Sequence, residues 1–152
     1  MKKYIAYGSN LNIEQMKRRC PSATIYGTGF LNDWALAFRS MYGPAFATIE
    51  SNSGHEVPVA VWNIDKSAEM ALDIYEGYPH HYFKRDIEVK MSTGESLTAM
   101  VYLMNKRSSP GLPSDNYIRT IYQGYLDNNL DISYLVKIVY ELSSTSNKIY
   151  MW

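Results

Sequence analysis

One carboxylate has the position expected of a proton-transfer group. The sequence predicts a helix from Lys66 to Glu76, which begins after the capping residue Asp65 and ends at Gly77. Its apolar stripe consists of Ala68, Ala71, Leu72 and Tyr75. Glu76 falls on or beside this stripe, at the end of the helix where the dipole disfavours negative charge by about 0.3–1 kcal/mol. Partial burial would add to this effect, and both would raise the pKa of Glu76 toward the range useful for acid–base catalysis.

The alternative for this helix is a purely structural one. In that interpretation the end of the helix frays and the Glu76 side chain points into water. Asp73 and Glu69 lie elsewhere on the helix, and we expect them to form an ordinary solvated face.

The turn after the first expected strand is a second candidate site. It reads Tyr7-Gly8-Ser9-Asn10-Leu11, and Gly8 allows the backbone to approach a ligand closely. Successive N–H groups before a helix can form a concave site for an anion. The glycine-rich phosphate-binding signatures are absent, and the surroundings of Ser9 do not match a hydrolase nucleophile. A plain turn, followed by a helix capped by Asn12, is the alternative.

The remaining reactive residue types favour structural roles. We expect Cys20 to be a small buried residue at the end of a short helix. His80 and His81 are adjacent and lack metal-ligand spacing, so a surface loop is expected there. The basic pairs at 18–19 and 106–107 are expected to be solvated. The sequence therefore predicts no metal site and no cofactor.

Composition narrows the class of protein further. The 152 residues carry no net charge, which argues against binding to nucleic acid or to an anionic membrane surface. No stretch has the length of a signal peptide or a transmembrane helix. The single cysteine rules out an internal disulfide and favours a cytoplasmic location. Fourteen tyrosines against four phenylalanines suggest many hydroxyl groups that meet water, backbone or a ligand.

The elements that must position these residues mix strands and helices without regular alternation. Expected strands cover residues 3–7, segments within 23–38, 45–50, 57–64, 83–91 and 97–104, with turn-rich breaks at 27–33 and 51–54. Expected helices cover 12–19, 66–76, 115–127 and 132–141, and residues 105–113 form a loop. We therefore predict one domain over residues 1–152, of the α+β class, with a mixed or barrel-like sheet.

The motifs together resemble those of a known family, the gamma-glutamylcyclotransferases and their cyclotransferase-like relatives. The resemblance covers the chain from Tyr4 to about Tyr134. Two motifs carry most of it: the segment Tyr4-Ile5-Ala6-Tyr7-Gly8-Ser9-Asn10-Leu11 and the segment Leu72-Asp73-Ile74-Tyr75-Glu76-Gly77. Shorter matches follow the same order: Arg19-Cys20-Pro21-Ser22-Ala23, Ala47-Thr48-Ile49, Tyr102-Leu103-Met104 and Pro113-Ser114-Asp115-Asn116-Tyr117.

The resemblance implies a small mixed β-barrel with flanking helices and one cavity. It implies that Glu76 is the catalytic carboxylate, acting without cofactor, and that the turn at Gly8 binds the glutamyl group through backbone N–H groups. The substrate-binding residues that it implies are Tyr4, Ile5, Ala6, Tyr7, Gly8, Ser9, Asn10, Tyr82, Tyr102 and Tyr117. The reaction that it implies is attack of the substrate's α-amine on its own γ-amide, which gives 5-oxoproline and a free amine or amino acid.

Departures from the family pattern bear on the leaving group. Gly43-Pro44-Ala45-Phe46 stands where some members have Gly-Gly, and Lys84 stands where an Arg is frequent.

The expected partner is a small gamma-glutamyl compound, with no nucleic acid and no membrane, and a homodimer is left open. A non-catalytic binding or interaction module on the same fold is the alternative function. The packing of the aromatic tail, residues 149–152, is also left open.

Overall fold

A long β-hairpin forms the largest part of the sheet. The computed structural model describes residues 1–41 and 43–150, except for the side chains of 145–150. Strand β2 (Thr24–Ser40) pairs antiparallel with β3 (Phe46–Ile64) along nearly its whole length. Both were expected to be broken. The turn-rich residues at 27–33 and 51–54 lie within continuous strands instead, because the long ladder absorbs the irregularities as register shifts at Ile25/Gly27 and Asn32/Trp34.

The other strands close this hairpin into a barrel. Strand β1 (Lys2–Ala6) pairs with β3 on one side and, in parallel, with β5 (Ser96–Met104) on the other. Strand β4 (Tyr82–Met91) pairs with β5 and then with β2, so the order β3-β1-β5-β4-β2 returns to β3. The mixed β-barrel of the α+β class is therefore confirmed.

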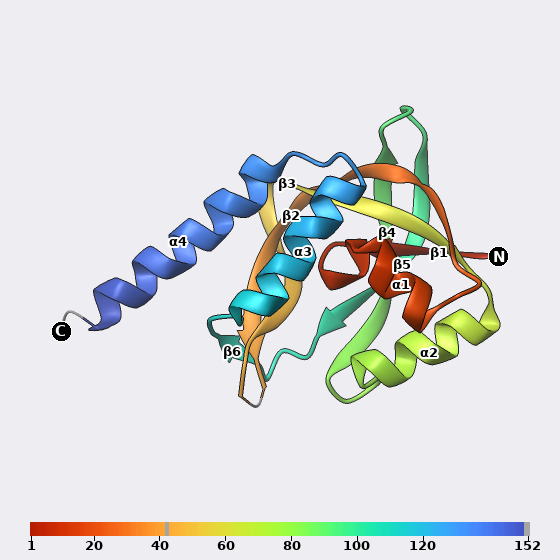
Figure 1. Ribbon diagram of the computed structural model, residues 1–152. Coiled ribbons are helices and arrows are strands. Elements are labelled where there is room, and N and C mark those ends of the chain that lie inside the picture. The colour runs from red at the N-terminus through yellow and green to blue at the C-terminus, as the bar shows by residue number, and fades with distance from the viewer. Residues whose placement is uncertain (42, 151–152) are drawn as a thin grey trace.

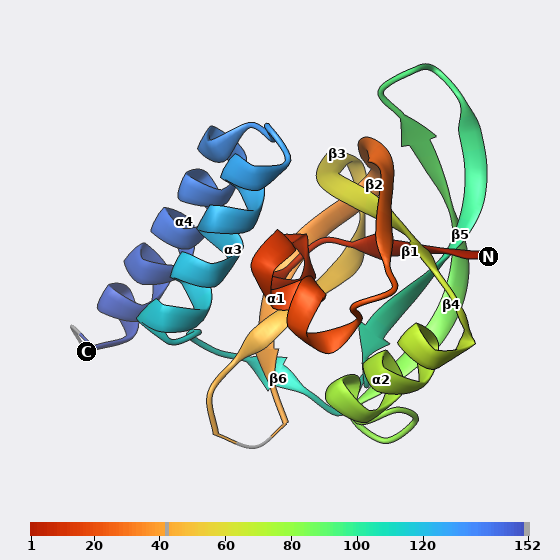
Figure 2. The same cartoon turned by 45° about the vertical axis from the view of Figure 1, so that its right-hand side comes forward.

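The helices lie around this barrel (Figures 1 and 2). They are a short 3-10 helix, η1 (Ser9–Leu11), and α1 (Ile13–Arg19), α2 (Lys66–Glu76), α3 (Asp115–Asp127) and α4 (Ile132–Tyr150). Figure 2 shows α3 and α4 side by side on one flank of the barrel, with α2 on the opposite flank. Helix α4 runs well past its expected end. The aromatic tail lies outside the described side chains.

Side-chain caps set the helix starts as the sequence predicts. Asp65 accepts from the N–H of Ala68 at 2.8 Å, and Ser114 accepts from the N–H of Tyr117 at 3.2 Å. The expected loop at 105–113 also contains a two-residue strand, β6 (Ser109–Pro110), which pairs with β2. Among the described residues, no helix combines the length and apolar character needed to cross a membrane.

Candidate active site

A cavity of about 390 Å³ opens where the ends of several elements meet. Its wall contains most of the residues that the sequence singles out, from the turn after β1, the end of α2 and the starts of β4 and α3. The lining residues are Tyr4, Tyr7, Gly8, Ser9, Asn10, Phe46, Ala47, Ile74, Tyr75, Glu76, Gly77, His81, Tyr82, Tyr102 and Tyr117.

The end of α2 directs Glu76 into this cavity. Leu72 and Ala68 are buried, so the helix face that carries them is fixed against the barrel. Gly77 then ends the helix with φ at +65°, a left-handed conformation that favours glycine. The N–H of Tyr78 returns to the carbonyl of Asp73 at 2.9 Å, which completes the cap. Glu76 is therefore held at a fixed helix end, and the alternative of a frayed end in water is wrong.

Burial raises the pKa of Glu76 from 4.5 to about 7, and the positive charge of Arg19 partly opposes this shift. The side chain keeps some contact with solvent through the cavity, although protein atoms surround it. Among the described residues, no group within hydrogen-bonding distance donates to its carboxylate. An unpaired carboxyl group whose pKa lies near neutrality can both accept and release a proton at physiological pH.

The turn after β1 forms the opposite part of the wall. Helix η1 begins at Ser9, and its first backbone bond runs from the N–H of Leu11 to the carbonyl of Gly8 at 3.0 Å. The N–H groups of Ser9 and Asn10 precede that bond, so they have no acceptor within the helix. A Cβ on Gly8 would lie 3.0 Å from the Cβ of Ala47, so glycine allows this turn to approach β3 closely.

Tyrosine hydroxyl groups brace the wall by bonding to the protein itself. Tyr7 donates to the carbonyl of Tyr102 at 2.6 Å, and Tyr82 donates to the carbonyl of Ala47 at 2.8 Å. The N–H of Ala47 donates in turn to the hydroxyl of Tyr117 at 3.0 Å. Burial raises the pKa of Tyr82 far above its usual range, so its hydroxyl stays neutral. Several of the surplus tyrosines thus satisfy backbone groups at the cavity.

Two of the predicted substrate-binding residues do not line the cavity. Ile5 and Ala6 are completely or almost completely buried in the barrel core, where β1 pairs with both β3 and β5. Both side chains belong to the hydrophobic core, one on each face of the strand, and they reach the site only through the strand that ends in the turn at Gly8.

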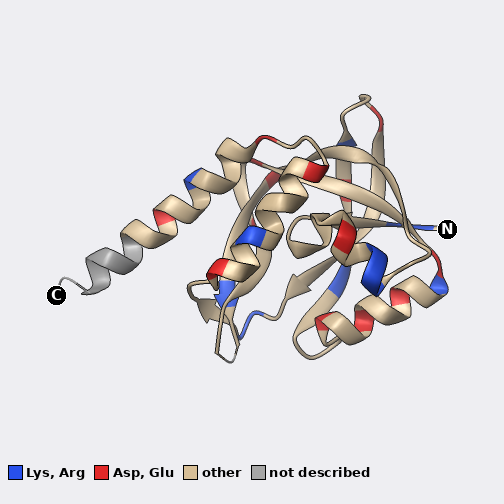
Figure 3. Cartoon of the chain, in the orientation of Figure 1, with Lys and Arg blue, Asp and Glu red and all other residues tan. Residues whose placement is uncertain are grey.

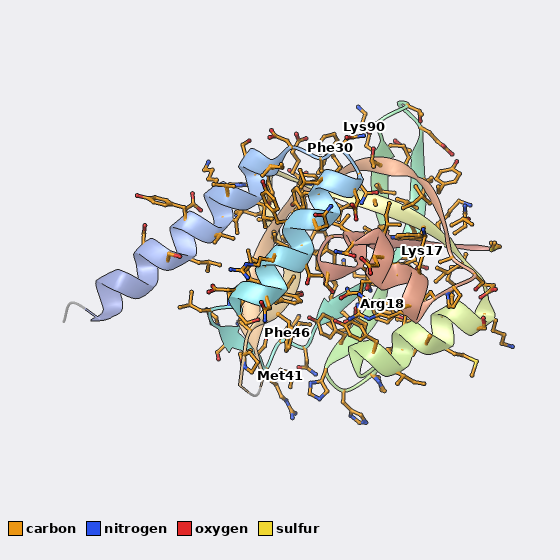
Figure 4. The ribbon with its side chains drawn as sticks, viewed as in Figure 1. Lys17, Arg18, Phe30, Met41, Phe46 and Lys90 are labelled. Atoms are coloured by element: carbon orange, nitrogen blue, oxygen red, sulfur yellow. The ribbon has the colours of Figure 1, made fainter. Side chains whose placement is uncertain are left out.

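Several cavity residues were missed by the sequence reasoning. His81 lies exposed in the loop after α2, as expected, and it also lines the cavity. Tyr75 was assigned to the buried stripe, yet it lines the cavity as well. Tyr75 is half-exposed because the helix ends one residue later, at the cavity mouth. The signal available for Tyr75 was its place next to Glu76 in the second motif. Phe46 and Ile74 also line the cavity and gave no signal of their own (Figure 4 labels Phe46).

The charged residues near α2 also differ from the prediction. Arg19 is half-buried and acts on Glu76, so it is not simply solvated. Asp73 and Glu69 are not a free solvated face either, because Lys84 binds both, at 2.9 and 2.7 Å. No group of three or more potential metal ligands occurs among the described residues.

The mixed barrel that carries this cavity also occurs among known structures. A solved structure titled "Gamma-glutamyl cyclotransferase" superposes with a TM-score of 0.82 at 31% identity, over 90% of this chain and 85% of that one. Residues 4–122 match the family model for gamma-glutamyl cyclotransferase, AIG2-like proteins.

Curated relatives agree with this assignment. The gamma-glutamylcyclotransferases of Homo sapiens and Bos taurus are each 37% identical over 145 residues, which covers 89% of this chain and 76% of theirs. The chain belongs to the gamma-glutamyl cyclotransferase family, and the resemblance read from its motifs is confirmed.

Proposed function

We propose that this protein is a gamma-glutamylcyclotransferase, an enzyme that releases an amine or amino acid from a gamma-glutamyl amide and forms 5-oxoproline. The observation that carries the proposal is the buried carboxyl group of Glu76, whose pKa burial raises to about 7 and which lines the same cavity as the turn at Gly8. The curated names of the relatives support the same activity.

The substrate brings its own nucleophile. Its α-amine attacks the γ-carbonyl carbon and forms the ring C–N bond, and the bond to the leaving nitrogen then breaks. The cavity has to fold the glutamyl chain so that amine and carbonyl are close, since such positioning replaces an encounter in solution. The braced tyrosines supply a rigid wall for this purpose.

Glu76 serves both proton transfers. As a carboxylate it takes a proton from the substrate ammonium group, which frees the amine for attack. As a carboxylic acid it then gives that proton to the leaving nitrogen. The attacking nitrogen, which keeps one hydrogen in the ring, loses its second proton through the Glu76 carboxylate to the departing amine, which leaves as an ammonium ion, so the enzyme returns to its starting state. A pKa of about 7 suits both steps near neutral pH.

The turn at Gly8 would bind the negative charge of the substrate. The N–H groups of Ser9 and Asn10 have no acceptor within η1, and both residues lie on the cavity wall. Donors placed in this way stabilise an oxyanion that develops on the γ-carbonyl oxygen. We assign them, with Gly8, to the glutamyl end of the substrate.

Further parts of the proposal rest on the sequence alone. The scheme uses no cofactor, since the nucleophile comes from the substrate and the acid–base group from Glu76. The lone Cys20 favours the cytoplasm as the location. It also remains a prediction that the substrate is a small gamma-glutamyl compound and that nucleic acids and membranes are not partners. Whether the protein forms a homodimer is left open.

The test is incubation with a panel of gamma-glutamyl amino acids and gamma-glutamyl amines, followed by measurement of 5-oxoproline. We expect release of 5-oxoproline and the free amine in equal amounts. The matched control substrate is an N-α-acetylated gamma-glutamyl amide, which has no free amine and should not react. If the whole panel stays intact while the protein still binds its members, the protein is a binding module and the proposal fails.

A further inference from the structure

The inner face of α1 holds the turn that forms the glutamyl end of the cavity. Gln15 and Arg19 are four residues apart, so they lie on the same face of the helix. The side-chain amide of Gln15 donates to the carbonyl of Ser9 at 2.9 Å. Arg19 Nη1 donates to Asn10 Oδ1 at 2.6 Å. Two consecutive residues of η1 are thus each bound by one residue of α1.

The bond from Arg19 fixes which way the Asn10 amide points. With its oxygen accepting from the guanidinium, its Nδ2 donates to the hydroxyl of Tyr4 at 2.9 Å. The backbone carbonyl of Asn10 accepts from Trp62 Nε1 at 3.1 Å. Both Asn10 and Tyr4 are buried and line the cavity. Arg19 therefore orients Asn10 directly and Tyr4 through Asn10.

The same guanidinium also contacts α2. Its Cζ lies 3.2 Å from the centre of the Tyr75 ring, an arrangement in which the cation meets the electron-rich face. Tyr75 lies at the cavity mouth and directly precedes Glu76. Arg19 therefore connects α1, the turn at Asn10 and the catalytic end of α2, although it is not itself a lining residue.

The charge of Arg19 reaches the carboxylate without direct contact. The ion pairs among the described residues do not include one between Arg19 and Glu76. The positive charge nevertheless favours the ionised form of Glu76 and opposes the effect of burial on its pKa.

The other titratable groups that face Glu76 are mostly phenols. They come from β1, β4, β5 and α3, and burial raises the pKa of each, so they stay neutral: Tyr4, Tyr7, Tyr82, Tyr102 and Tyr117. Tyr75 and His81 complete the set at the mouth. A histidine ordinarily changes charge between about pH 5 and 8, so the test has to separate His81 from Glu76.

We infer that Arg19 is the positioning residue of this site: it orients Asn10 and Tyr75 by direct contact and places a positive charge beside the end of α2 that carries Glu76. The kinetic part of this inference rests on the proposed cyclotransferase activity. Glu76 has to begin the reaction as a carboxylate in order to take the ammonium proton. Arg19 increases the fraction of protein molecules in which Glu76 is a carboxylate. It does so without a direct ion pair to Glu76, which would prevent the carboxylate from taking up a proton.

Three variants separate these two functions. Arg19→Gln removes the charge, and Arg19→Lys keeps a charge but loses the planar group that stacks on Tyr75. Arg18→Gln is the matched control, because Arg18 is the neighbouring residue of α1, carries the same charge and is exposed (labelled in Figure 4). Each of the three variants is compared with the unaltered protein. The same comparison is repeated with His81→Asn added to every protein.

The first readout is the pH profile of kcat/KM for 5-oxoproline formation. For Arg19→Gln we expect the acid limb to move to higher pH, with about 3- to 10-fold less activity at neutral pH. Alkaline pH should recover this loss only in part, because the contacts with Asn10 and Tyr75 stay lost. Arg19→Lys should keep the midpoint of the unaltered protein but raise KM, since the wall is less well ordered. Arg18→Gln should match the unaltered protein in both respects.

The second readout does not depend on turnover. The titration of Glu76 is followed by the carboxyl ¹³C signal of labelled protein, assigned by its absence in Glu76→Gln, and binding of 5-oxoproline is measured by calorimetry. We expect the Glu76 midpoint to rise in Arg19→Gln only, in both His81 backgrounds, and 5-oxoproline to bind more weakly to both Arg19 variants.

Two results would overturn the inference. One is a Glu76 midpoint in Arg19→Gln equal to that in Arg18→Gln, and the other is unchanged 5-oxoproline binding in both Arg19 variants. If Arg19→Gln fails to fold, Arg19→Lys still decides the positioning role through KM and binding. If the unaltered protein forms no 5-oxoproline, the proposed function fails, but the ¹³C titration still tests the charge of Arg19.

Discussion

Two carboxylates of α2, Asp73 and Glu76, lie one helical turn apart in different surroundings, and acidic positions recur along this helix in Figure 3. Asp73 accepts from the hydroxyl of Tyr102 at 2.6 Å and forms an ion pair with Lys84 at 2.9 Å. Glu76 has no such donor among the described residues and instead faces the cavity with a pKa raised to about 7 by burial.

The difference shows how position decides between structural and chemical use of the same group. A carboxylate held by a cation and a hydroxyl is stabilised in its charged form, so it can fasten α2 to β4 and β5. A buried carboxylate without donors exchanges its proton readily near neutral pH. The helix thus fastens itself to the barrel with one acid and presents the other to the cavity.

The strongest test of this difference between Asp73 and Glu76 is the variant Glu76→Gln. The variant keeps the size of the side chain but cannot carry protons, so we expect fold and ligand binding to be retained while kcat falls at least about 10²-fold. The measurement is the rate of 5-oxoproline release together with a binding isotherm. An active Gln variant would remove Glu76 from the mechanism.

The stability of the unaltered protein should depend on pH with a sign that Glu76 defines. The folded-state pKa of Glu76 is raised from 4.5 to about 7, so between these values the folded protein binds more protons than the unfolded chain. Stability is therefore lost as pH rises through this window, by up to about 3 kcal/mol at about 1.4 kcal/mol per pKa unit.

Glu76→Gln removes this loss, so it should be more stable than the unaltered protein at pH 8–9 and equal to it near pH 4. Denaturant unfolding at several pH values measures the difference. A variant that is less stable at all pH values would contradict the environment assigned to Glu76.

Asp73→Asn should lower the stability at neutral pH, whereas Glu76→Gln should not. Lys84 and Tyr102 both lose a charged acceptor, so we expect a loss of about 1–3 kcal/mol in the free energy of unfolding. The rate should fall less than tenfold, because Asp73 reaches the cavity only through Tyr102. A double-mutant cycle with Lys84→Met shows whether the two residues act together, and purely additive effects would refute the pairing.

Glu69→Gln should have the smallest effect of the series. Glu69 accepts from Lys2 and Lys84, but the Lys2 side chain is 50% exposed, and ion pairs of this kind contribute about 0–1 kcal/mol. We expect a free energy of unfolding within about 1 kcal/mol of that of the unaltered protein and an unchanged rate of 5-oxoproline release. A larger loss of stability or of rate would place Glu69, with Asp73, among the contacts that hold α2 in position.

Local signals in the sequence were enough to locate the end of α2 that carries Glu76. The cap at Asp65 and the stop at Gly77 act over a few residues, so they define the helix whatever surrounds it. The hairpin at residues 92–95 and the start of α3 at Ser114 follow from equally local chemistry and were also predicted correctly.

Long-range pairing explains what the sequence reasoning missed. Glycines and turn residues in β2 and β3 suggested breaks, but each strand has its partner beside it along nearly its whole length, and the ladder outweighs the local preference. Arg19 was expected to be solvated, because its contact with Tyr75 and its effect on Glu76 depend on residues far away in the chain.

The sequence by itself determined the caps, the helix that ends at Glu76, the turn at Gly8 and the family. Only the tertiary structure decided that Asp73 is paired and Glu76 is not, that Ile5 and Ala6 lie in the core, and that Arg19 acts on the cavity. The physical reason is that caps and turns are short-range interactions, whereas burial and charge pairing depend on which distant residues the barrel brings together.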